Sequence, residues 1–82
     1  MAATFRRSRN RRRADLRQVF GRNLRRACAA RHINAARLAE LTGKSRRTIE
    51  RVLAGQGNPT LSFVRQVAQI VDVPLIELFR DR

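Results

Sequence analysis

Apolar residues recur at helical spacing over the first third of the chain. The stripe that they form is typical of an amphipathic helix with one buried face. The spacing predicts a first helix from about residue 15 to residue 31, with Asp15 at the positive end of the helix dipole. The members of the stripe are Leu16, Phe20, Leu24, Ala27 and Cys28.

Two shorter apolar patterns follow. Asn34 and Ser45 are suited to cap helices that run to about residues 41 and 54, because their side chains can accept a backbone N–H. Gly43 lies in the three-residue turn between them, where glycine readily takes left-handed backbone angles. Two short helices around so tight a turn favour a helix-turn-helix at about residues 35–54. The residues expected on their buried sides are Leu38, Ala39, Leu41, Ile49, Val52 and Leu53.

The remainder of the chain predicts two further helices. A loop rich in glycine ends with Asn58 and Pro59, and Thr60 is suited to cap a fourth helix over about 61–71. Pro74 is well placed to begin a fifth helix that ends near Phe79. No segment alternates strictly between apolar and polar residues, so no strand is expected and the fold class is all-α.

The chain is strongly basic, with a formal net charge of +13 that comes from 18 Arg and one Lys against six acids. This charge favours a polyanionic partner, and nucleic acid is the commonest one for a basic domain. A general bias toward arginine without a specific partner is the alternative. Residues 1–13 contain no acid, so we expect them to form a disordered arm that binds nucleic acid, or a solubilising tail, before a domain of residues 14–82. The arginines of the arm are Arg6, Arg7, Arg9, Arg11, Arg12 and Arg13.

Other classes of function find little support in the sequence. Cys28 and His32 are single residues of their types, so neither a disulfide nor a metal site is expected. The acids are scattered, and no glycine-rich phosphate loop is present. No apolar run reaches the ~18 residues of a membrane span. We therefore expect no enzyme, no cofactor, no small-molecule substrate and no membrane association, and a reducing cytoplasmic setting.

The sequence resembles the lambda-repressor-like (XRE) helix-turn-helix family. Three segments follow the spacing of that family without a gap from about Phe20 to Phe79, namely FGRNLRRACAARHINAARLAELTG, KSRRTIERVLAGQGNP and TLSFVRQVAQIVDVPLIELF. The resemblance implies a five-helix domain whose third helix lies in the major groove of DNA. It also implies a bacterial or phage protein near the nucleoid. The residues of the fourth helix that match the family's core are Leu61, Val64, Ala68 and Val71.

The resemblance also implies which residues contact DNA. Positions that touch bases or adjacent phosphates in the family are held here by Ser45, Arg46, Arg47 and Arg51. Arginine favours the O6 and N7 acceptors of guanine, so a half-site that contains guanine is expected. The alternative is that these arginines contact phosphate alone, or are solvated.

A second set of positions contacts the DNA backbone in the family. Here they are held by Asn34, Lys44, Thr48 and Asn58. Asn34 can equally serve as a helix cap and Asn58 as a loop residue, so both interpretations stay open.

Two departures from the family pattern concern the first three helices. Many relatives begin the second helix with a glutamine that contacts DNA, whereas this chain has Ala35. Relatives often pair an arginine late in the first helix with a glutamate late in the third, where this chain has Cys28 and Leu53. Replacing both ions of a buried pair with apolar residues is often neutral or stabilising, so these two should touch in the core. A redox role for Cys28 is the minority interpretation.

A third departure is an excess of apolar residues in the last two helices. Exposed apolar stripes usually mark interfaces, so we expect a homodimer through these helices. The alternative is that the first helix or the N-terminal segment, for instance Phe5, covers these side chains. The candidate interface residues are Phe63, Ile70, Ile76 and Phe79.

The leading hypothesis is a transcriptional regulator that binds double-stranded DNA sequence-specifically, as a homodimer on a palindromic operator. One rival is an RNA binder that acts through the arginine-rich arm. A second rival is an antitoxin-like module whose main partner is another protein. Deletion of residues 1–13 separates the DNA-binding hypothesis from the RNA-binding one, because an RNA reader would lose its specificity and a DNA reader would mainly lose affinity.

Overall fold

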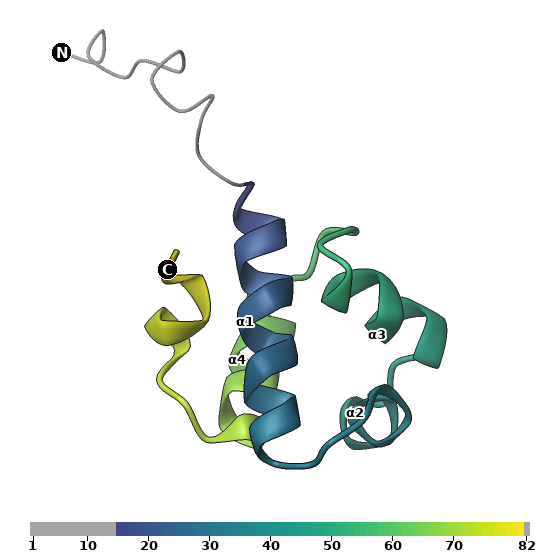
Figure 1. Cartoon of the computed structure of the whole chain (residues 1–82). Helices are drawn as coiled ribbons and strands as arrows, with labels where there is room; N and C mark the ends of the chain where they lie inside the picture. The colour runs from purple at the N-terminus through teal and green to yellow at the C-terminus, as the bar shows by residue number, and fades with distance from the viewer. Residues whose placement is uncertain (1–14, 82) are drawn as a thin grey trace, which may run out of the picture.

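The computed structural model describes residues 15–81, which form a bundle of short helices around one core. The elements are α1 (Leu16–Ala30), α2 (Ala35–Thr42), α3 (Arg46–Leu53), α4 (Leu61–Val71) and the 3-10 helix η3 (Leu75–Phe79). In Figure 1, α1 stands at the centre, with α2 and α3 on one side and the C-terminal segment on the other. No strand occurs in residues 15–81, as the all-α prediction requires. The arginine-rich arm lies outside the described residues.

Four of the predicted helices are confirmed within one or two residues of their expected bounds, and the fifth is not an α-helix. The segment after Pro74 is a 3-10 helix of five residues without a side-chain cap. Such helices have poorer hydrogen-bond geometry and occur in short pieces. The described chain therefore has four α-helices, and the five-helix count is not confirmed.

The starts of the helices lie where the capping residues predicted them. The side chain of Asn34 accepts the Arg37 N–H at 2.8 Å, and that of Thr60 accepts the Phe63 N–H at 3.1 Å. Gly43 ends α2 in the left-handed conformation, with φ of 75°. Because glycine adopts this conformation without steric cost, the chain can turn sharply from α2 into α3.

The core is built from one face of each helix. In three helices it differs in part from the prediction, because Leu16 is 62%, Leu41 is 39% and Leu61 is 81% exposed. Leu16 and Leu61 lie in the first turn of their helices and Leu41 lies in the last turn of α2, so all three are at helix ends and not in the middle of the packed faces. Cys28 is buried as expected, and Leu53 packs against the same core. The buried apolar side chains are Val19, Phe20, Leu24, Cys28, Leu38, Ala39, Ile49, Val52, Phe63, Val64, Val67, Ala68, Val71 and Leu78.

Two of the four candidate interface residues belong to the fold itself. Phe63 is only 4% exposed and lies in the core, so its prediction as an exposed interface residue is wrong. Phe79 is half-buried and stacks on Phe20, with ring centroids 5.3 Å apart. Its ring therefore holds η3 against α1. Ile70 is half-buried beside the core, and Ile76 is 64% exposed.

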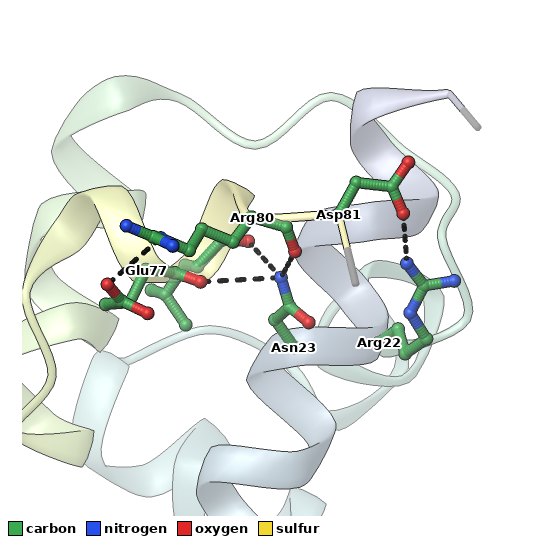
Figure 2. A network of polar contacts seen from close by, with 6 residues as sticks. Arg22, Asn23, Glu77, Arg80 and Asp81 are labelled. Carbon is green, nitrogen blue, oxygen red and sulfur yellow. Dashed lines mark hydrogen bonds and ion pairs between the residues drawn. The ribbon is translucent and has the colours of Figure 1, made fainter. Parts of the chain in front are cut away.

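Polar side chains of α1 also attach the C-terminal segment to this helix. The Asn23 amide nitrogen donates to the backbone carbonyls of Leu78 at 3.0 Å and Arg80 at 2.7 Å, with a longer contact of 3.4 Å to that of Glu77 (Figure 2). These carbonyls lie in and after the 3-10 turn, where the backbone offers them few partners. Arg22, next to Asn23, pairs with Asp81 at 3.0 Å, so α1 binds the end of the described chain at two points.

The end of α3 lies close against Gly21, a residue that is buried in the interior of α1. A Cβ atom at this position would lie 2.6 Å from the Val52 carbonyl oxygen and 3.0 Å from the Leu53 carbonyl oxygen. Both atoms are backbone at the end of α3, which cannot move aside as a flexible side chain would. The absence of a side chain at Gly21 therefore sets how closely α3 packs on α1.

We expect Gly21→Ala to destabilise the protein by about 1–3 kcal/mol, because the added methyl group must push α3 away from α1. Helix propensity alone would give the opposite sign, since alanine is favoured over glycine in a helix interior by about 1 kcal/mol. Urea denaturation followed by circular dichroism measures the difference. A variant as stable as the parent, or more stable, would contradict the close contact.

Candidate nucleic-acid interface

The exposed face of α3 carries three arginines and one glutamate, namely Arg46, Arg47, Glu50 and Arg51. On a helix, positions i, i+1, i+4 and i+5 lie on one side. The opposite side holds Ile49 and Val52, which are 0% and 5% exposed. Burial of these two apolar residues thus turns the arginines outward, as the sequence predicted.

The N-terminus of α3 is fixed by two hydroxyl groups. Ser45 accepts the Thr48 backbone N–H at 3.0 Å and donates to the Thr48 hydroxyl at 2.9 Å. This arrangement satisfies one of the unpaired amides of the first turn. It also leaves the proton of the Thr48 hydroxyl available to an external acceptor. Both side chains are exposed on the same side of the molecule as the turn from α2.

A cavity of about 140 Å³ opens beside α3, between the α2–α3 turn and the start of α4. It brings together three of the four residues predicted to contact the DNA backbone, Lys44, Thr48 and Asn58, and adds Arg51 from the predicted base-reading set. The fourth, Asn34, does not line it, and its side-chain oxygen caps α2. With two cations, a hydroxyl and an amide around it, the cavity suits an anion.

The Lys44 side chain contacts Phe63, which the sequence had suggested as a residue of the dimer interface. Its ammonium nitrogen lies 5.9 Å from the centroid of the Phe63 ring, within the range of a cation–π contact. Phe63 also lines the cavity. A core phenylalanine thus supports a cation at the surface, which the spacing of apolar residues in α4 could not show.

The three arginines of the α3 face differ in their partners. Arg46 pairs through Nε with Glu50 at 3.1 Å, and both side chains are more than half exposed. Within the described residues, neither Arg47 nor Arg51 forms a salt bridge, so both guanidinium groups are open to a ligand. Glu50 was not among the predicted site residues, although its spacing of four from Arg46 is that of a helical ion pair.

Residues 15–81 contain no cluster of three or more His, Cys, Asp or Glu side chains that could hold a metal ion. In the described residues no helix is both long and apolar enough to cross a membrane. Burial raises the pKa of the Cys28 thiol, which disfavours the reactive thiolate and fits its place in the core.

The chain matches one protein-family model and is similar to solved structures of a controller protein and a transcription factor. A family model described as a helix-turn-helix domain matches residues 19–79. The structure is similar to that of the restriction-modification controller protein C.AhdI from Aeromonas hydrophila, with a TM-score of 0.71 and 32% identity over 77% of this chain and 96% of that one. It is also similar to a hypothetical transcription factor, NHTF, from Neisseria, with a TM-score of 0.75 and 26% identity over 80% of this chain and 76% of that one. A search of curated proteins finds no match.

We expect Ser45→Ala to lower the free energy of unfolding by about 1 kcal/mol, because α3 loses its N-terminal cap. Ser45→Asp should retain most of the stability, since aspartate caps helices as well as serine does. Thermal and urea denaturation of the three proteins checks both values. Equal stability of Ser45→Ala and the parent would show that the hydrogen bond to Thr48 contributes nothing.

Proposed function

The chain belongs to the lambda-repressor-like (XRE) helix-turn-helix family, and from this premise we propose that it is a transcriptional regulator that reads double-stranded DNA with α3. The observation that carries the proposal is the exposed arginine face of α3, directed away from the core by Ile49 and Val52. The controller and transcription-factor neighbours support the same class of function. The function is that of a binding protein rather than an enzyme.

In the proposed complex, α3 enters the major groove. Its eight residues span ~12 Å, close to the width of that groove. Arg46 and Arg47 then face the base edges, with Ser45 before them at the N-terminus of the helix. Arg51 can reach a base or, from the cavity that it lines, an adjacent phosphate. Because the fork of arginine donates two hydrogen bonds to guanine, each half-site should contain guanine.

The cavity beside α3 would receive the sugar-phosphate backbone. Lys44, Thr48 and Asn58 can each donate to a phosphate oxygen, and such contacts fix the register of a protein on the duplex. Asn34 is a weaker candidate, since its side-chain oxygen caps α2, although its amide N–H groups remain able to donate. The arginines of residues 1–13 would add sequence-independent affinity that falls as salt rises.

We propose further that two copies associate through η3 and the adjoining surface of α4. Ile76 is the most exposed of the predicted interface residues, and Leu75 beside it is 39% exposed. Leu75 also borders an open groove of about 390 Å³ that includes Ala68 and Val73. A symmetric dimer would present two α3 helices one DNA turn apart, ~34 Å, and so require a palindromic operator.

Selection of bound duplexes from a random library at near-physiological salt tests the proposal. We expect an inverted repeat that contains guanine in each half. On that site, Arg47→Ala should cost about 1–3 kcal/mol of binding free energy and relax the preference at one base pair. Arg12→Ala removes the same charge from the arginine-rich arm, and should weaken binding to all sequences alike.

Two results would contradict this assignment of roles. Recovery of generic duplex without a motif would exclude sequence reading and move the function to RNA or to a protein partner. Equal and sequence-independent losses in Arg47→Ala and Arg12→Ala would show that α3 contacts phosphate alone.

We expect Ile76→Glu to abolish the dimer, because a charge buried between two apolar surfaces is unfavourable. Leu61→Glu is the matched control, since Leu61 is more exposed but lies at the other end of α4. Sedimentation equilibrium over a concentration series measures the mass of each variant. A monomer–dimer equilibrium that Ile76→Glu leaves unchanged would place the interface elsewhere.

A further inference from the structure

The exposed face of α3 contains one carboxylate at the centre of its arginines. Glu50 lies one helical turn after Arg46, and on the same face as Arg47 and Arg51. The Glu50 side chain is 55% exposed, so it is directed toward whatever α3 meets. A surface that served only to attract phosphate would be weakened by this charge, since like charges at close range repel.

The bond between Arg46 and Glu50 has a specific geometry. Glu50 Oε2 accepts from Nε of Arg46 at 3.1 Å, which is the nitrogen nearest the helix. The guanidinium group is planar and has five N–H donors. A carboxylate at Nε therefore leaves both terminal nitrogens free and restricts the plane in which they lie.

Guanine presents two acceptors, O6 and N7, to the major groove. The two terminal nitrogens of Arg46 form a fork that matches this pair, and a fork held in one plane loses less conformational freedom when it binds. An arginine free to rotate could bond a phosphate oxygen as readily as a base. Fixing its plane thus favours the base.

We propose that Glu50 is a positioning residue that sets the sequence specificity of α3. It holds Arg46 through Nε so that the terminal nitrogens meet guanine, and its negative charge weakens binding to duplex of any sequence. This inference rests on the proposed function, because it assigns the discrimination of one base pair to a pair of residues within the DNA-reading helix.

The test compares the selected operator, the same operator with single guanines replaced, and a scrambled duplex, by fluorescence anisotropy at one salt concentration. Glu50→Gln should bind the scrambled duplex about fivefold more tightly, because one repulsive charge is lost. Its discrimination at a single guanine should fall about tenfold, since the fork is no longer held. The affinity for the scrambled duplex and the selectivity thus change in opposite senses.

Arg46→Ala identifies the guanine that this pair reads. In the double variant Arg46→Ala with Glu50→Gln, the second substitution should cause no further loss of discrimination at that position, because the two residues act as a unit. Glu40→Gln is the matched control. Glu40 pairs with Arg37 at 3.0 Å on α2, so the same charge is removed from an equivalent pair outside the face of α3. The Glu40→Gln variant should discriminate between the operator and its guanine-replaced forms as well as the parent does.

If Glu50→Gln tightens binding to the operator and to the scrambled duplex by the same factor, Glu50 is a solvated surface charge and the inference is overturned. The same holds if the loss of discrimination in Glu50→Gln falls at a position other than the one that Arg46→Ala affects. A parent protein that shows no sequence preference would instead refute the proposed function, so the two failures are distinguishable.

Discussion

The arrangement of this small protein depends on the contact between Gly21 of α1 and the end of α3. The carbonyl oxygens of Val52 and Leu53 lie where a side chain of residue 21 would be. Arg25, one turn further along α1, reaches the Leu53 carbonyl at 3.5 Å. The other end of α3 is held by the Ser45 cap and the turn at Gly43. With both ends fixed and Ile49 buried between them, α3 has one orientation, and its arginines project outward as a consequence.

Charge is distributed unevenly around that framework. Each of the six acids pairs with an arginine within the described residues, and the pairs are Asp15–Arg17, Arg22–Asp81, Arg31–Asp72, Arg37–Glu40, Arg46–Glu50 and Glu77–Arg80. Exposed pairs of this kind contribute little to stability. Because all six acids are used in these pairs, several cations of the described residues have no salt bridge, among them Lys44, Arg47 and Arg51 on the candidate interface. Unpaired positive charge is therefore available where α3 and the adjoining cavity meet solvent.

Much of this could be predicted from the sequence because the signals are local. Asn34, Ser45 and Thr60 cap their helices through bonds to backbone three residues away, which depend on nothing distant. The errors concern tertiary contacts. The α4 helix has apolar residues on more than one side, and periodicity alone could not tell that Phe63 is buried while Leu61 is exposed. The η3 segment is likewise held by bonds from Asn23, 54 to 57 residues away in the chain, which the local pattern could not show.

The burial of Phe63 also changes what a dimer interface could be. The apolar excess of α4 and η3 divides between two surfaces, because Phe63 lies beside Lys44 at the candidate DNA interface, whereas Leu75 and Ile76 are exposed on η3. A proposed interface centred on Leu75 and Ile76 is smaller than one that included all four predicted residues, and small interfaces give weak association. Weak association makes the fraction of dimer depend on protein concentration. A regulator built in this way would occupy a palindromic site more steeply with concentration than a permanent dimer does, because two association steps precede occupancy.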